Sequence, residues 1–216
     1  MHNNNLSEKQ NFNMILGQLF TNKVHNSEIL NAFAKNPRHA FLPDHLKAVA
    51  YVDEHLKINN STYQMSALLF AQLLEIIKVK KSEKVLEIGA STGFNATILS
   101  ELSQSIDSLY FDDTILNNAK DFLISKHKDN CHFVNSIPQN TKYDVIIVSG
   151  GITSFDSFAK HLEDNGRGIA VICNPSATNS PYLSLGEIRV FNKNGISVSS
   201  RLINRVNIFS LRLNNE

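Results

Sequence analysis

The sequence predicts an α/β fold built on a mostly parallel sheet, and three observations indicate it. From residue 84 onward, strand-like runs alternate with helical patterns; these runs are apolar on both faces; and a glycine-containing turn follows the first of them. Strands buried on both faces and separated by helices are typical of a parallel sheet covered on each side. The 216 residues, 42% of them hydrophobic, suffice for one large domain.

The elements of this core are expected in a regular order. After residue 186 the pattern contains no helix, and Asn194-Gly195 favours a tight turn, so we expect a C-terminal antiparallel hairpin that completes the sheet. Before that hairpin, strands are predicted at 84–89, 106–111, 131–135, 143–150 and 167–173, with helices at 94–102, 113–127 and 155–162.

The first 80 residues are predicted to be mainly helical. Apolar side chains recur at helical spacing between residues 7 and 34, Pro37 and Pro43 then interrupt the pattern, and residues 65–79 are apolar on nearly all sides. The last of these segments is expected to be a buried helix. We therefore divide the chain into an N-terminal helical segment, 1–80, packed on a core, 81–216.

Composition narrows the class of function. The formal net charge is +1, which gives no electrostatic reason to expect nucleic acid or an anionic membrane as partner. Cys131 and Cys173 lie in apolar runs, without the clustering that a disulfide framework or a zinc site needs, so no metal is expected. Neither a signal-peptide pattern nor an apolar stretch of membrane-spanning length is present, which favours a cytoplasmic protein.

The glycine turn follows the first core strand. Its frame is E-x-G-x-x-x-G, with Glu87, Gly89 and Gly93, and Ser91 lies between the glycines. The spacing does not fit the dinucleotide pattern G-x-G-x-x-G. It is instead the frame E-x-G-x-G-x-G of the S-adenosylmethionine turn, with Ser91 in place of the central glycine. Because a buried carboxylate needs a partner, Glu87 is expected to meet either a backbone amide of the turn or a cationic ligand.

The segment before this turn resembles the corresponding stretch of protein-L-isoaspartate O-methyltransferases. That family shows P-R-x-x-F-x-P followed by A-Y-x-D-x-x-L-x-I, and the resemblance covers residues from about 14 to 172. It implies a Rossmann-type fold, S-adenosylmethionine as methyl donor, and methylation of an isoaspartyl carboxylate in damaged protein. The matching residues are Pro37, Arg38, Phe41, Pro43, Ala50, Tyr51, Asp53, Leu56 and Ile58.

The resemblance also suggests which residues form the site. In strict register the ribose position is Tyr110, and a shift of two residues would bring Asp112 there; Ser136 replaces the family's adenine-binding Asp. Asp144 is expected to bond nearby backbone. The candidate cofactor-binding residues are Glu87, Gly89, Ser91, Gly93, Asp112, Ser136 and Ser149.

The active-site segment departs from the family pattern T-I-S-Q-P. Met65 occupies the position of the serine, and a thioether cannot donate a hydrogen bond. Ser66 and Thr62 are the candidate catalytic hydroxyls, with Tyr63 between them; alternatively, Met65 packs and Ser66 caps the following helix. Two functions remain open: a methyltransferase acting on a protein or peptide, or a catalytically impaired binding or scaffold protein with the same fold.

Overall fold

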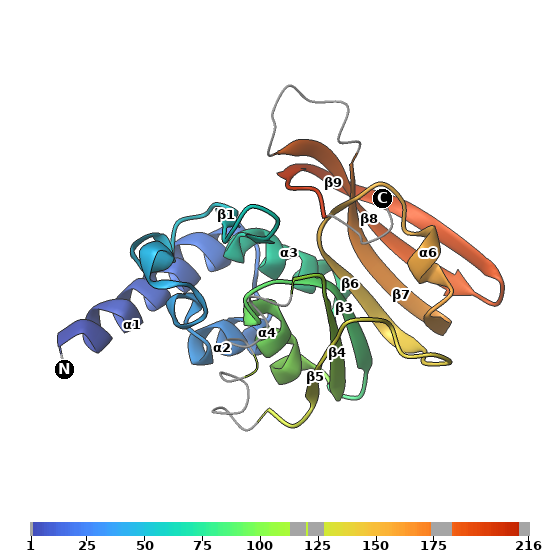
Figure 1. Ribbon diagram of the computed structural model, residues 1–216, viewed down its shortest axis with the longest axis horizontal. Coiled ribbons are helices and arrows are strands. Elements are labelled where there is room, and N and C mark those ends of the chain that lie inside the picture. The colour runs from blue at the N-terminus through green and yellow to red at the C-terminus, as the bar shows by residue number, and fades with distance from the viewer. Residues whose placement is uncertain (1, 113–119, 121–127, 174–182, 212–216) are drawn as a thin grey trace.

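The computed structural model describes residues 2–112, 120, 128–173 and 183–211 (Figure 1). The predicted fold class is confirmed: the sheet is mostly parallel, helices precede it, and an antiparallel hairpin ends it. The helix predicted over 113–127 lies, apart from Lys120, outside the described residues.

The sheet has seven strands in the described part of the chain, in the order β5-β4-β3-β6-β7-β8-β9. The first five in that order pair in parallel, whereas β8 and β9 pair antiparallel. Because β3 lies between β4 and β6, the strand order reverses there, which is where such sheets bind ligands. The strands are β3 (Lys84–Ala90), β4 (Ser105–Tyr110), β5 (Cys131–Val134), β6 (Tyr143–Ile152), β7 (Leu162–Cys173), β8 (Ser184–Asn194) and β9 (Ser197–Ile208).

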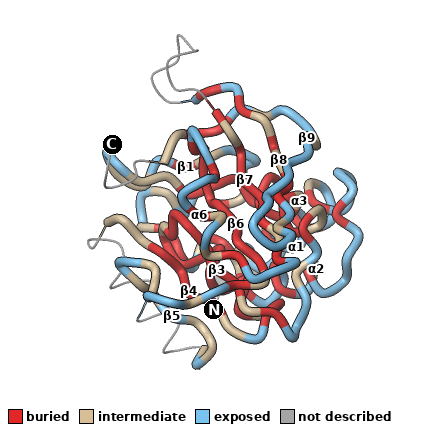
Figure 2. Tube along the Cα trace, turned by 90° about the vertical axis from the view of Figure 1, so that its right-hand side faces the viewer, coloured by how far each residue is buried: buried red, intermediate tan, exposed pale blue. Residues whose placement is uncertain are grey.

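The C-terminal hairpin differs from the prediction in one detail. Asn194 pairs with Ser197, so the two-residue loop consists of Gly195 and Ile196 and not of Asn194-Gly195. Gly195 supplies the positive φ, 57°, that a tight hairpin loop requires. Most of β9 is exposed, while the central strands carry the buried residues (Figure 2).

The residues before the sheet are mainly helical, as expected, and the division at residue 80 stays a prediction. Pro37 and Pro43 each precede a short 3₁₀ helix. A small antiparallel pair of strands, β1 and β2, was not predicted. The elements are α1 (His2–Met14), the π-helical η1 (Ile15–Leu19), the 3₁₀ helices η2 (Phe20–Asn22), η3 (Arg38–Phe41) and η4 (Asp44–Val49), α2 (Ser27–Lys35), β1 (Leu56–Lys57), β2 (Tyr63–Gln64) and α3 (Ala67–Ile77).

Both faces of the central sheet are buried. On one face, Val85 and Val145 pack in a cluster shared with α2, α3 and α4 (Phe94–Leu102). On the other face, Leu86 and Ile146 pack with Phe158 of α6 (Asp156–Ala159). Alternate side chains along each strand therefore pack into two different hydrophobic cores. This explains why these runs are apolar on both faces.

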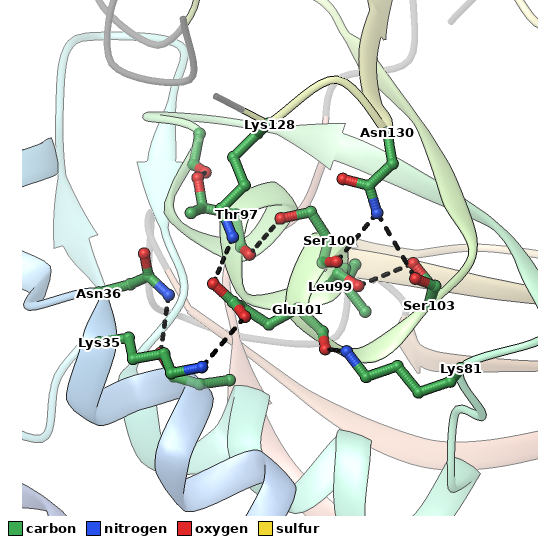
Figure 3. A network of polar contacts seen from close by, with 12 residues as sticks. Lys35, Asn36, Lys81, Thr97, Leu99, Ser100, Glu101, Ser103, Lys128 and Asn130 are labelled. Carbon is green, nitrogen blue, oxygen red and sulfur yellow. Dashed lines mark hydrogen bonds and ion pairs between the residues drawn. The ribbon is translucent and has the colours of Figure 1, made fainter. Parts of the chain in front are cut away.

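A polar cluster joins the N-terminal segment to the core at the end of α4 (Figure 3). The Glu101 carboxylate accepts a hydrogen bond from Lys128 and lies 3.7 Å from the ammonium of Lys35 on α2. Lys81 donates to the backbone carbonyl of Glu101, a carbonyl group at the end of the helix. Of these contacts, the ion pair with Lys35 links the end of α4 to α2.

The described residues also bear on the compositional expectations. Their helices lack the combination of length and apolarity needed to cross a membrane. Cys131 and Cys173 are free thiols. Within the same part of the chain, His, Cys, Asp and Glu side chains do not gather in groups of three or more that could hold a metal ion.

Candidate functional site

The glycine turn lies at the carboxyl end of β3, next to β6. Gly89 and Gly93 have φ angles of 90° and 85°, a region that favours glycine, and Gly93 is the N-cap of α4. The Ser91 hydroxyl oxygen is buried and has no hydrogen-bond partner among the described residues. Leaving a buried hydroxyl unpaired is unfavourable, so this oxygen is available to a water molecule or a ligand, and the predicted role of Ser91 in cofactor binding stays a prediction.

Glu87 lies within β3, and its side chain is only 1% exposed. Its carboxyl oxygens accept hydrogen bonds from the hydroxyls of Ser108 on β4 (2.5 Å) and Ser149 on β6 (2.7 Å). Burial raises the pKa of Glu87, although these hydroxyls oppose the shift. The partners therefore differ from the backbone amide or cationic ligand suggested by the sequence.

This contact extends into a chain of buried hydrogen bonds that reaches the N-terminal segment. Asn95 on α4 donates to the Ser149 hydroxyl (3.1 Å) and accepts from Gln64 on β2 (2.9 Å). Gln64 in turn accepts from the Thr92 hydroxyl in the glycine turn (2.7 Å). Sequence reasoning missed Gln64, Asn95 and Thr92. Asn95 lies as a polar residue in an apolar run, whereas Gln64 and Thr92 lie in polar stretches that gave no sign of this contact.

Asp112 follows β4 and holds the loop between β1 and β2. One oxygen of its carboxylate accepts from the Asn59 amide (2.7 Å) and from the hydroxyls of Ser61 (3.2 Å) and Thr62 (3.0 Å). Asp112 lines a small cavity at the glycine turn, whereas Tyr110 pairs with Ala90 at the end of β4. Which of Asp112 and Tyr110 meets the ribose stays a prediction.

Two other residues with predicted roles lie further along the sheet. Ser136 follows β5 and is exposed, and it is not among the residues that line the two cavities described here. Asp144 at the start of β6 accepts the backbone N–H of Lys84 (2.8 Å), which confirms that it bonds nearby backbone.

A second, larger cavity of about 450 Å³ lies beside the small one. Tyr63 lines both of them, so the two cavities are neighbours. The larger cavity is lined by Asp53, Glu54, His55, Tyr63, Ser66, Leu183 and Asn207.

The two candidate catalytic hydroxyls lie in different cavities. Ser66 lines the larger one, and its hydroxyl oxygen caps α3 by accepting the Leu69 N–H (3.2 Å). Thr62 lines the smaller one and donates to Asp112. Met65 is 1% exposed and packs in the core, and its backbone carbonyl accepts from Arg38 (3.0 Å). Met65 therefore packs and Ser66 caps the following helix, as one of the two interpretations expects, and a catalytic role of Ser66 or Thr62 stays a prediction.

The residues at the turn offer suitable polar groups for S-adenosylmethionine, but the space beside them is small. The cavity there measures about 30 Å³, because Leu211, from the end of the described chain, lies against Gly89. That volume holds about one water molecule. The chemistry of the residues fits the cofactor, whereas the volume does not fit it in this conformation.

Comparison with known proteins agrees with the fold and the turn. The family model described as protein-L-isoaspartate(D-aspartate) O-methyltransferase matches residues 9–179. The protein-L-isoaspartate O-methyltransferase of Pelotomaculum thermopropionicum is 26% identical over 165 residues, 74% of this chain and 72% of that protein. The enzyme of that name from Pyrococcus abyssi is 29% identical over 189 residues, 81% of this chain and 86% of its own length.

Two solved structures share the fold. A protein-L-isoaspartate O-methyltransferase superposes with a TM-score of 0.78 at 22% identity, covering 96% of this chain and 66% of that one. A putative protein-L-isoaspartate O-methyltransferase from Plasmodium falciparum, solved with S-adenosyl-L-homocysteine, gives 0.73 at 14% identity, covering 92% and 96%.

The reversed strand order, the turn after β3 and the antiparallel end of the sheet define a Rossmann-like methyltransferase fold. More narrowly, the chain belongs to the protein-L-isoaspartate(D-aspartate) O-methyltransferase family, S-adenosylmethionine-dependent enzymes that act on isoaspartyl residues of proteins. The resemblance found in the sequence, the enzyme class and the methyl donor are thereby confirmed.

Proposed function

We propose that this chain methylates an isoaspartyl carboxylate held in the larger cavity, with S-adenosylmethionine held at the glycine turn. The observation that carries the proposal is the position of Tyr63, which lines both cavities. A donor at the turn and an acceptor in the larger cavity would therefore be separated by a single side chain, which brings the two reactants together.

S-adenosylmethionine supplies an electrophilic methyl group on a sulfonium ion. The remaining task of the chain is to bind, to align and to exclude water, since a carboxylate acceptor needs no strong base. We assign these binding roles to Glu87, Gly89, Ser91, Gly93 and Ser149 at the turn and on the strands beside it. We assign further binding roles to Asp112 and Ser136, which follow β4 and β5.

The acceptor side rests on Ser66. Its oxygen already accepts the Leu69 N–H, so its own hydrogen remains to be donated to an acceptor carboxylate in the larger cavity. Thr62, whose hydroxyl is directed to Asp112, belongs to the donor side. Asp53 and Glu54 line the acceptor cavity as well, and their negative charge favours an isoaspartyl peptide with basic neighbours.

A methyl-transfer assay tests this function. The protein is incubated with radiolabelled S-adenosylmethionine and a lysine-flanked isoaspartyl peptide, and the matched peptide with ordinary aspartate is the control. We expect methyl ester to form on the isoaspartyl peptide alone. Bound S-adenosylmethionine without transfer to any isoaspartyl peptide would favour the catalytically impaired binding protein.

The proposed hydrogen bond from Ser66 to the acceptor carboxylate can be tested separately from the role of Ser66 as the N-cap of α3. Glycine costs only a few tenths of a kcal/mol at an N-cap and has no side-chain donor, so Ser66→Gly should keep stability within about 0.5 kcal/mol. We expect it to reduce the methylation rate by roughly tenfold or more, the usual effect of losing one hydrogen bond to a charged group. Ser66→Thr, which keeps both the cap and the hydroxyl, is the matched control. An unchanged rate in Ser66→Gly would remove Ser66 from the acceptor site.

A further inference from the structure

The chain turns back into the crevice of the sheet after β9. Residues Phe209–Leu211, here called the tail segment, run beside the end of β6 in parallel with Gly151. The Gly151 N–H donates to the Phe209 carbonyl (2.8 Å), and the Leu211 N–H donates to the Gly151 carbonyl (2.8 Å). The pairing of β3 with β6 is recorded only as far as Ile88 and Val148, so the tail segment lies where these two strands no longer pair.

The Leu211 side chain fills the space that two glycines leave. A Cβ atom placed on Gly89 would lie 2.7 Å from Leu211 Cδ1, and one on Gly150 would lie 2.5 Å from Leu211 Cγ. Both distances are shorter than van der Waals contact. Glycine at the end of β3 normally lets a ligand approach the backbone, and here a side chain of the same molecule makes that approach.

The tail segment is held from the other side by the N-terminal segment. Phe209, only 1% exposed, stacks on Tyr63 with ring centroids 5.1 Å apart and meets the edge of His55 at 5.2 Å. The ring of His55 lies between the Asn207 carbonyl (3.1 Å) and the Ser66 N–H (3.0 Å). His55 before β1, Tyr63 on β2 and Ser66 at the start of α3 thus lie around the end of β9.

These contacts leave a cavity of about 30 Å³ beside Gly89 and Leu211 in the described part of the chain. A whole cofactor of this kind needs a site of about 300–1,000 Å³. A cofactor group that approaches the backbone at Gly89 and the Leu211 side chain therefore compete for the same space.

We propose that the tail segment is an internal occupant of the cofactor crevice, and that S-adenosylmethionine binds only after Leu211 has left Gly89 and Gly150. This inference rests on the proposed function, because it concerns the same crevice. The measured affinity for the cofactor is then the intrinsic affinity multiplied by the fraction of molecules whose tail segment is displaced.

The first test weakens the tail segment. Leu211→Ala removes the side chain from the two glycines, and Leu202→Ala on exposed β9 is the matched control. By calorimetry with S-adenosylmethionine and S-adenosylhomocysteine, we expect Leu211→Ala to bind about tenfold more tightly than the wild type, since about that factor corresponds to the lost burial. Equal affinity of wild type and Leu211→Ala would overturn the inference.

The second test locks the tail segment in place. Cys173 Sγ lies 3.8 Å from the Ser210 hydroxyl oxygen, so Ser210→Cys puts two thiols side by side; Cys131→Ser removes the remaining cysteine. Thiol titration reports whether the disulfide between Cys173 and the introduced cysteine forms. If it does not form, the comparison of Leu211→Ala with the wild type tests the inference. We expect the oxidised protein to lose cofactor binding and reduction to restore it.

The outcomes separate the two proposals. Oxidised, locked protein that binds the cofactor as well as reduced protein overturns the inference about the tail segment and leaves the proposed function intact. Folded protein that binds no cofactor in any reduced variant, including Leu211→Ala, overturns the proposed function itself.

Discussion

Glu87 is a carboxyl group inside the sheet, and its hydrogen bonds come from serine hydroxyls and not from a cation. Burial raises its pKa, so the folded state holds this proton to a higher pH than the unfolded state does. The stability that this group contributes is therefore complete below the ordinary glutamate pKa and declines as the pH rises through the folded pKa. A neutral isostere would escape this decline.

We expect Glu87→Gln to be at least as stable as the wild type at pH 7.5, with a smaller difference at pH 4.5. Glu87→Leu should instead lose about 2 kcal/mol, because the hydroxyl hydrogens of Ser108 and Ser149 would be left without this acceptor. Denaturant unfolding at both pH values measures the effect. A large loss in Glu87→Gln at pH 7.5 would mean that the carboxyl is ionised in the fold.

For individual residues, the sequence predicted positions in the fold better than it predicted hydrogen-bond partners. Glu87, Gly89 and Ser149 were placed near the crevice because they end or interrupt apolar strands. The bond between Glu87 and Ser108 joins two strands, and a linear sequence does not give their relative register. Met65 was compared with a catalytic serine, but the packing that directs its side chain into the core depends on the whole N-terminal segment.

Among the elements, the short helix η3 carries Arg38, whose side chain bonds to the backbone of the neighbouring loop. The buried guanidinium of Arg38 donates to the backbone carbonyls of Ala50, Val52, Glu54 and Met65, over distances of 3.0 to 3.3 Å. Burial lowers the pKa of Arg38 to about 10, while the charge of Asp53 opposes the shift, so the group stays protonated at neutral pH. One side chain thus fixes the loop that carries the residues of the acceptor cavity.

We expect Arg38→Lys to destabilise the protein by about 2–4 kcal/mol, because an ammonium cannot reproduce the planar fork that reaches four carbonyls. Arg201→Lys on exposed β9 is the matched control and should change the free energy of unfolding by less than about 0.5 kcal/mol. Thermal and denaturant unfolding supply the measurements. Equal stabilities of the two variants would show that water replaces the guanidinium without loss.

Elements with a strong apolar period could be predicted from the sequence, whereas elements with a weak period could not. Helix α4 begins and ends at the predicted residues, since an apolar period lies between a glycine turn and a polar stretch. The two-residue strands β1 and β2 pair within a polar segment, and their pairing is fixed by Asp112 from the far side of the crevice. Such long-range stabilisation leaves no local pattern in the sequence.

For the whole molecule, residues 55–63 of the N-terminal segment meet the tail segment at the crevice of the sheet. The N-terminal segment supplies Tyr63 and His55, the C-terminal end supplies Phe209, and the glycine turn lies beneath. Neither the position of the tail segment nor its contact with Gly89 could be predicted, because residues 209–211 read as the continuation of a strand. The fold class could be predicted from local sequence patterns. Whether Leu211 fills the crevice depends instead on contacts between segments far apart in the sequence.

Displacement of the tail segment should be visible in amide hydrogen exchange. Because the Leu211 N–H is bonded to Gly151 and the Gly151 N–H to Phe209, saturating S-adenosylmethionine should speed exchange at both amides while slowing it at Gly89. The Gly195 amide, bonded to the Asp164 side chain at the distant hairpin, is the internal control and should not change. An ordinary ligand that fits an open crevice would slow exchange around it, so slower exchange at Leu211 on cofactor binding would mean that the tail segment stays in place.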